Sequence, residues 1–341
     1  MFPKLSTLLA NFSVIKQKCV LQLNLDTPLK DLTRWLQSNH WLSPDESLIR
    51  IEKPGEGNMN VVLRLQTDRR SLILKQSRPY VNKYQDIPAP LERIEVEYQF
   101  YTQIKGANVD HMVPTIMAYA PDQHLLLMED LGEGRDLTTY YPQRSVPSND
   151  LTDLLEFLRK VHQQKVDQYP DNMELRKLNH QHIFVLPFMD KNGFQLDDIQ
   201  AGLQEVSLSY KTDQTLKTEI SRLGELYLLQ GHTLLHGDYY PGSWLHSAGQ
   251  LSVIDPEFSF LGFPEFDLGV MVAHLMLITG EESWLATCQS GYGLPLQEKL
   301  VRQIAGTEIM RRLIGLAQLP LERSLEEKAA LLKMARKMIV V

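Results

Sequence analysis

The spacing of apolar residues changes along the chain, and each change predicts a different kind of element. Apolar residues recur at helical spacing from residue 28 to residue 41, which predicts a short helix. Between residues 48 and 75 the period falls to two, with turn-forming residues at 54–58 and 67–70, so three antiparallel strands are predicted. Residues 124–128 form another apolar run of strand length. The first part of the chain therefore predicts a small antiparallel β-sheet.

The second part of the chain favours helices. Apolar positions follow a helical period, and the predicted helices are residues 150–165, 212–229, 268–278 and 321–341. The apolar run 268–278 includes His274 and is shorter than the ~18 residues that a membrane span needs, so we expect a buried helix and no membrane association.

This distribution predicts an α+β fold with two lobes, because strands come first and helices follow. We expect residues 1–42 to form an N-terminal extension with a lead-in helix. Residues 43–131 are predicted as a small N-lobe built on the sheet, and residues 132–341 as a larger, mainly helical C-lobe.

One stretch of the C-lobe concentrates acidic residues around a predicted β-hairpin. Two short alternating runs, 243–246 and 251–254, are joined by the turn-forming residues Ser-Ala-Gly-Gln. Asp238 precedes the hairpin, and Asp255 and Glu257 follow it, so folding the ribbon back brings these carboxylates to one edge. Clustered carboxylates repel one another, and a stable fold keeps them together where a cation or a reacting proton compensates.

Composition narrows the classes of partner. With 341 residues and 43% hydrophobic content the chain can bury the cores of about two domains. A net charge of -7 leaves no basic footprint, so we expect no nucleic-acid partner. Cys19 and Cys288 have no paired spacing, which argues against a disulfide framework or a zinc site and favours the cytoplasm. The sequence does not fix the oligomeric state, and a homodimer stays open.

The motifs around the hairpin resemble those of small-molecule kinases. Protein kinases place a catalytic Asp five residues before a metal-binding amide, and a second metal-binding Asp beyond the next hairpin. Here Ser243 stands five residues after Asp238, and Asp255 occupies the second position. The loop His-Gly-Asp at 236–238 resembles the aminoglycoside phosphotransferase and choline kinase superfamily, which has a protein kinase-like fold. Ser243 in place of Asn, with Asp-Pro-Glu-Phe at 255–258, narrows the resemblance to the methylthioribose kinase family.

The first predicted turn resembles that family's nucleotide-covering loop. Residues 54–60 contain Gly55, Gly57, Asn58 and Asn60 in a GxGNxN arrangement. Glycines let backbone N–H groups approach phosphate oxygens with no Cβ in the way. Without the neighbouring motifs, two glycines between strands would indicate an ordinary hairpin turn.

A lysine at the end of the third strand completes the nucleotide side. Lys75 lies where a strand lysine reaches the α- and β-phosphates in kinases. The amphipathic segment 91–105 resembles the kinase helix whose glutamate pairs with that lysine, and we assign the role to Glu95, with Glu92 and Glu97 as alternatives. A lone lysine at a strand end would otherwise be a solvated edge residue.

The segment Met-Glu-Asp-Leu at 128–131 resembles the hinge between the lobes of the family. The resemblance implies that main-chain groups of Glu129 and Leu131 bind the adenine edge, since a strand end leaves unpaired N–H and C=O groups. Two solvated acids at a strand end would be the ordinary interpretation.

The resemblance also assigns the phosphoryl-transfer residues. It implies that Asp238 is the catalytic base, and that Asp255, Glu257 and Ser243 hold Mg²⁺, a cation that prefers oxygen ligands. ATP is the implied phosphate donor.

On the acceptor side, the family's twin arginine corresponds to Arg311 and Arg312 within a helix at 305–317. These guanidinium groups are suited to binding an oxyanion or the moving phosphoryl group, although without the family they would indicate a solvated basic face. The loop departs from the family where Tyr239, Tyr240 and Pro241 replace a Leu-His-Thr run. We expect the tyrosines beside Asp238 to reshape the substrate pocket, and we assign a substrate contact to Tyr239.

The implied activity is transfer of the γ-phosphate of ATP to the 1-hydroxyl of 5-methylthioribose, a step of methionine salvage. The altered loop keeps a second acceptor open: another sugar, an amino alcohol or an aminoglycoside. A catalytically silent nucleotide-binding protein is a third hypothesis, against which the presence of Lys75, Asp238, Asp255 and Glu257 argues.

Three further polar residues are predicted to be structural. We expect the ring of His236 to hold its loop through a hydrogen bond to the backbone, and His162 to be a core or helix-end residue. Asp267 either supports the loop from behind or caps the helix that follows, and we favour the cap.

Overall fold

A five-stranded antiparallel sheet forms the N-lobe. In the computed structural model, which describes residues 21–55, 57 and 59–340, its strands lie in the order β1, β2, β3, β7, β6. Their bounds are β1 Leu48–Glu52, β2 Val61–Thr67, β3 Ser71–Gln76, β6 Ile116–Ala120 and β7 Leu125–Glu129. The predicted strands are confirmed. The edge strand β6 escapes prediction because its residues are mostly half-buried and show no clear alternation.

The two-residue period of these strands separates two faces of the sheet. One face carries leucines that pack against helix α1 (Leu29–Ser38), whose Leu32 and Leu36 are fully buried. The lead-in helix therefore shares a core with the N-lobe sheet. The opposite face carries Val62, Ile73 and Lys75, since residues two apart in a strand point to the same side.

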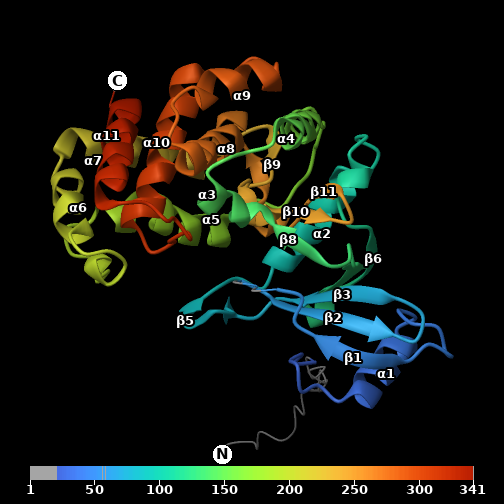
Figure 1. Cartoon of the computed structure of the whole chain (residues 1–341). Coiled ribbons are helices and arrows are strands. Elements are labelled where there is room, and N and C mark those ends of the chain that lie inside the picture. The colour runs from blue at the N-terminus through green and yellow to red at the C-terminus, as the bar shows by residue number, and fades with distance from the viewer. Residues whose placement is uncertain (1–20, 56, 58, 341) are drawn as a thin grey trace, which may run out of the picture.

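Helix α2 (Arg93–Gln103) lies between the sheet and the C-lobe, as Figure 1 shows. Before it, a short hairpin of β4 (Tyr80–Val81) and β5 (Tyr84–Pro88) projects from the N-lobe. The chain then forms β6 and β7 before the mainly helical part begins.

The C-lobe is mainly helical and surrounds one central helix. Every residue from Glu265 to Ile278 of α8 is buried, as expected for a helix that is apolar on all sides. The helices are α3 Tyr140–Gln143, α4 Ser148–His162, α5 Met173–His180, α6 Leu203–Lys211, α7 Gln214–Leu228, α8 Pro264–Thr279, α9 Trp284–Tyr292, α10 Glu298–Ile314 and α11 Leu325–Ile339. The helices predicted in this lobe are confirmed.

Short strands of the C-lobe form two small antiparallel sheets. Strand β10 (Trp244–Ser247) pairs with β11 (Gln250–Val253) and with β8 (Gly134–Asp136), and β9 (Thr233–Leu235) pairs with β12 (Phe260–Gly262). The predicted hairpin is confirmed, and its turn places Ala248 and Gly249 at φ values of 51° and 80°. Positive φ at both central positions suits the twist of a tight hairpin.

In the part of the chain that the structure describes, no helix has both the length and the apolar character needed to span a bilayer.

The packing of α1 on the sheet gives a first prediction. Replacing the buried Leu36 by Ala should lower the free energy of unfolding by about 2–5 kcal/mol, because it leaves a cavity in the N-lobe core. Leu25→Ala is the control, since Leu25 is 52% exposed, and should change stability by less than about 0.5 kcal/mol. Urea unfolding measures both, and equal stabilities would show that α1 does not belong to this core.

Candidate active site

The loop that carries Asp238 connects β9 to the hairpin and requires glycine at position 237. Gly237 has a φ of 84°, and a Cβ there would lie 2.1 Å from the carbonyl oxygen of Phe258. Only glycine adopts this positive φ without strain and has no Cβ to clash with that oxygen.

Asp267 of α8 holds this loop from behind. Its carboxylate accepts hydrogen bonds from the backbone N–H groups of His236 (2.6 Å) and Gly237 (2.9 Å). The prediction that Asp267 caps the helix is wrong, because α8 begins at Pro264 and Asp267 already lies inside its first turn. The alternative of loop support is what the structure shows.

The two histidines behave as structural residues. The ring of His236 contacts the carbonyl oxygen of Ile254 through Nε2 at 3.0 Å, which confirms the predicted hydrogen bond to the backbone. His162 is 8% exposed at the end of α4, with Nδ1 2.8 Å from the Tyr292 hydroxyl and Nε2 3.2 Å from Asp267.

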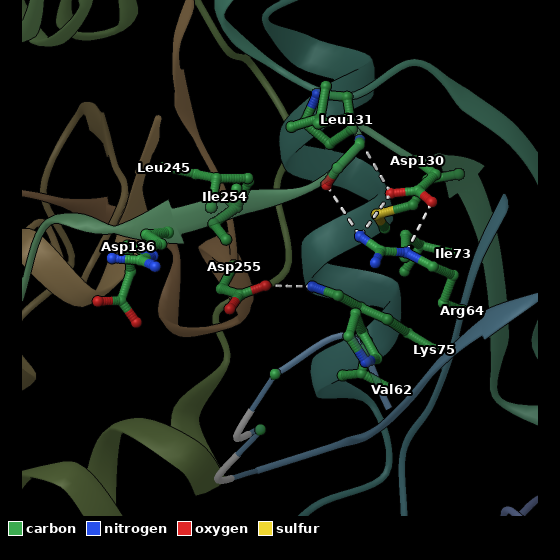
Figure 2. Close-up of a pocket in the computed structure, with 18 of the residues that line it drawn as sticks. Val62, Arg64, Ile73, Lys75, Asp130, Leu131, Asp136, Leu245, Ile254 and Asp255 are labelled. Atoms are coloured by element: carbon green, nitrogen blue, oxygen red, sulfur yellow. Dashed lines mark hydrogen bonds and ion pairs between the residues drawn. The ribbon is translucent and has the colours of Figure 1, made fainter. Parts of the chain in front are cut away.

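Two cavities between the lobes meet at Asp255. A cavity of about 510 Å³ is lined by Asp238, Asp255 and Glu257, so the hairpin brings these carboxylates to one place, as predicted. A second cavity of about 400 Å³ is lined by Asp255 and by Lys75 from the N-lobe. Figure 2 shows the Lys75 ammonium group joined to the Asp255 carboxylate by an ion pair at the wall of this second cavity.

Lys75 bridges the two lobes. Its ammonium group forms ion pairs with Asp255 and, at 2.5 Å, with Glu97 of α2. Burial disfavours the charged form, but the carboxylates of Asp255 and Glu97 outweigh it and raise the lysine pKa well above its usual value. Lys75 is therefore a charged group inside the protein.

The assignment of Glu95 as the partner of Lys75 is wrong. Glu95 is exposed, whereas Glu97 is fully buried on the helix face that also carries Ile94 and Tyr101. These residues follow the i, i+3, i+7 spacing of a core-facing stripe, so the apolar period itself pointed to Glu97.

The glycine-containing loop approaches the second cavity. Gly55 and Gly57 both line it, and their contact with phosphate stays a prediction, while Asn58 lies outside the described residues. The amide of Asn60 is used inside the protein instead: it donates to Glu257 at 2.9 Å and accepts from Arg93 at 2.8 Å. A nucleotide contact by Asn60 would require these bonds to break.

Glu257 belongs to a buried polar group that includes both lobes. Its Oε2 lies 3.5 Å from Nε of Arg93, a residue of α2 with no exposed surface. Burial raises the pKa of Glu257 to about 8, although Arg93 opposes the shift. A cation close to this carboxylate would favour its ionised form.

The oxygen donors suit magnesium. Asp255 opens onto both cavities and Glu257 onto the larger one, and Mg²⁺ typically uses one or two carboxylates together with substrate phosphates. No cluster of three metal-binding side chains occurs within the described ranges, so the remaining ligands would be phosphate oxygens and water. The hydroxyl of Ser243 donates to the carbonyl oxygen of Asp238 at 2.9 Å, and its contact with a metal stays a prediction.

The hinge residues Glu129 and Leu131 line the second cavity, and their contact with adenine stays a prediction. Sequence reasoning missed Arg64, which lies on the same sheet face as Lys75. Its Nε is 2.8 Å from Asp130, and its Nη2 donates to the carbonyl oxygen of Gly132 at 2.8 Å. Arg64 therefore ties β2 to the hinge (Figure 2).

The two tyrosines after Asp238 point in opposite directions. Tyr239, predicted to contact substrate, is fully buried, and its hydroxyl donates to the carbonyl oxygen of Leu154 at 2.8 Å, so that prediction is wrong. Tyr240 instead lines the larger cavity. The backbone N–H of Tyr240 donates to the carbonyl oxygen of Asp238 at 3.1 Å, so the chain turns at Tyr239, and the side chains of Asp238 and Tyr240 line the same cavity.

The twin arginines reach the same cavity. Arg311 and Arg312 both line it, and Nη2 of Arg312 lies 3.7 Å from Oδ1 of Asp238. Burial raises the pKa of Asp238 to about 6, and the two arginines limit that rise. The group is thus an ionised carboxylate near neutral pH that can still accept a proton.

Comparison with known proteins places this geometry in a family. Residues 50–303, most of the chain, match the phosphotransferase enzyme family. The chain belongs to that family. The chain is 30% identical over 245 residues to a methylthioribose kinase of Exiguobacterium sibiricum, and the matched region spans 67% of this chain and 61% of the relative's length. It is 27% identical over 364 residues to a methylthioribose kinase of Pectobacterium atrosepticum, with 90% of each chain covered.

Solved structures agree on the fold. A spectinomycin phosphotransferase crystallised with ADP and spectinomycin superposes with a TM-score of 0.52 at 12% identity, over 92% of this chain and 98% of that one. At this identity the likeness concerns the fold alone, and it confirms the predicted kinase-like arrangement of the two lobes.

The loop clamp gives a second prediction. Asp267→Asn should lower the free energy of unfolding by about 1–3 kcal/mol, because a neutral amide has one acceptor oxygen where the carboxylate uses both. Asp198→Asn changes an exposed aspartate and should alter stability by less than about 0.5 kcal/mol. Urea unfolding of both variants tests this, and a fully stable Asp267→Asn would contradict the clamp.

Proposed function

We propose that this phosphotransferase transfers the γ-phosphate of ATP to a small-molecule hydroxyl group, and that the acceptor is the 1-hydroxyl of 5-methylthioribose. The observation that carries the proposal is the meeting of the two cavities at Asp255, with Lys75 on one side and Asp238 on the other. A phosphoryl group held at this junction would be within reach of an acceptor bound beside Asp238.

The smaller cavity supplies the features of a nucleotide site. Main-chain groups of Glu129 and Leu131 would bind the adenine edge, and Gly55 and Gly57 would bring N–H groups to the phosphates. Lys75 is charged and would neutralise phosphate oxygens. Asp255 and Glu257 would hold Mg²⁺, which supplies further charge neutralisation when bound.

The larger cavity supplies the base and the acceptor site. Asp238 would accept a hydrogen bond from the substrate hydroxyl and take its proton as the phosphoryl group is transferred. Its raised pKa, about 6, suits a group that must be ionised before the transfer and protonated after it.

The wall of the larger cavity carries charges of both signs together with apolar side chains. Arg311, Arg312 and Lys83 line it, as do the acids Asp136, Asp238, Asp255 and Glu257 and apolar side chains such as Leu316 and Val81. A ribose with an apolar methylthio substituent matches the apolar part of this wall, and the relatives named above are methylthioribose kinases.

An acceptor panel tests the proposal and gives the third prediction. ADP release should require 5-methylthioribose and should fall about 10²–10⁴-fold in Asp238→Asn. The melting shift produced by ATP and Mg²⁺ should persist in that variant, because Asp238 lies on the acceptor side. Turnover with amino alcohols or aminoglycosides alone would reject the proposed acceptor. Equal ATP turnover by wild type and variant across the panel would favour the silent nucleotide-binding protein.

The corrected lysine partner gives the fourth prediction. Glu97→Gln should lower kcat/KM about 10²-fold, because Lys75 loses the anchor that aims it at the phosphates. Glu95→Gln, two positions away on the exposed face of the same helix, should leave kcat/KM close to the wild-type value. Steady-state kinetics with varied ATP distinguish them, and equal losses in both variants would contradict the assignment.

A further inference from the structure

A chain of buried polar side chains lies beneath the acceptor side of the larger cavity. It starts at Tyr141 of α3, passes through His274 of α8, and ends at Glu308 of α10, helices that pack side by side (Figure 1). The Tyr141 hydroxyl is 2.6 Å from Nδ1 of His274, and Nε2 of His274 is 3.2 Å from Oε1 of Glu308. Neither the fold nor the proposed chemistry so far accounts for Glu308, an acid that is 1% exposed.

Glu308 binds both arginines of the acceptor site. Its carboxylate accepts from Nη1 of Arg311 at 3.1 Å and 3.0 Å and from Nε of Arg312 at 2.6 Å. Residues three and four positions apart lie on one side of a helix, so a single acid can reach two adjacent arginines. Adjacent residues on a helix point about 100° apart. The shared carboxylate of Glu308 bridges this separation between Arg311 and Arg312.

The protonation states fix the direction of every bond in the chain. Burial lowers the pKa of His274 to about 4, so its ring is neutral and carries one proton. Burial would raise the pKa of Glu308, but Arg311 and Arg312 outweigh it and hold that pKa well below its usual value. His274 therefore donates from Nε2 to the carboxylate and accepts at Nδ1 from Tyr141.

Glu308 and Asp238 compete for Arg312. Nε of Arg312 is 2.6 Å from Glu308, whereas Nη2 lies 3.7 Å from Asp238, beyond hydrogen-bond distance. The guanidinium also lies 4.6 Å from the centre of the Tyr240 ring. With Glu308 removed, the nearest acid to Arg312 would be Asp238, and a direct ion pair would occupy the base.

We propose that Glu308 is a positioning residue, held by His274 and Tyr141, which aims Arg311 and Arg312 at the acceptor and keeps Arg312 from pairing with Asp238. This inference rests on the proposed function, because it assigns the acceptor side of the same site. The proposal predicts changes in the kinetic constants for the acceptor and in the mobility of the two arginines, and no change in nucleotide binding.

The test compares Glu308→Gln with Glu298→Gln in the full chain. Glu298 lies on the same helix and also bonds an arginine four residues on, Arg302 at 2.7 Å, but this pair is exposed. Glu308→Gln should raise the KM for 5-methylthioribose and lower kcat, each about tenfold or more, with the KM for ATP unchanged. Glu298→Gln should match the wild type. A folded Glu308→Gln with wild-type acceptor KM and kcat would overturn the proposal.

Two further measurements keep the test decisive. Tyr141→Phe removes one hydroxyl at the far end of the chain and should raise the acceptor KM about threefold or more, even where Glu308→Gln fails to fold. An unchanged acceptor KM in Tyr141→Phe would count against the proposed role of the buried polar side chains.

Modification of Arg312 by phenylglyoxal, followed by peptide mass spectrometry, should be faster in Glu308→Gln and in Tyr141→Phe than in the wild type. That rate needs no turnover, so it decides the positioning role even where the proposed acceptor is rejected, and equal rates would refute the role.

Discussion

The arrangement of the two lobes depends on a buried lysine that needs partners from both of them. Lys75 is 5% exposed, and an ammonium group at such a position is stable only when carboxylates surround it. Glu97 comes from the N-lobe helix and Asp255 from the C-lobe hairpin, so the ion pairs are complete only when the lobes face each other in one way. The same alignment of the lobes brings the two cavities together, and the proposed transfer of a phosphoryl group from one cavity to the other requires this.

Other buried charged side chains likewise require partners. Arg93 bonds Asn60 and contacts Glu257, Asp267 holds the backbone of the Asp238 loop, and Glu308 holds the twin arginines. Such pairs add little net stability, because desolvation offsets their attraction, but removing one partner leaves an uncompensated charge. Their contribution is therefore to geometry: each one fixes a side chain or loop whose position the proposed chemistry requires.

Local sequence patterns were sufficient to predict much of the architecture. The strands of the N-lobe, the hairpin and the buried helix α8 follow from periods of two and 3.6 and from turn residues, which act over a few neighbours. The motifs placed Asp238, Asp255 and Lys75 correctly because their order along the chain is tied to those elements. The assignment of Glu95 overlooked the apolar period of its own helix, which pointed to Glu97. The roles predicted for Tyr239 and Asp267 were plausible from nearest neighbours but fail because their partners, Leu154 and the backbone of residues 236–237, lie in other segments of the chain.

The amino-acid sequence alone determined the classes of element, their order, and the set of acids and bases available for phosphoryl transfer, since these depend on composition and short-range spacing. Only the tertiary structure decided that Lys75 pairs with Asp255 of the other lobe, which tyrosine faces the acceptor, and that one acid, Glu308, binds both arginines. Those choices are made by packing between segments up to 180 residues apart, as Lys75 and Asp255 are. A periodic pattern records which face of an element is buried, but not which side chain of another element lies opposite it.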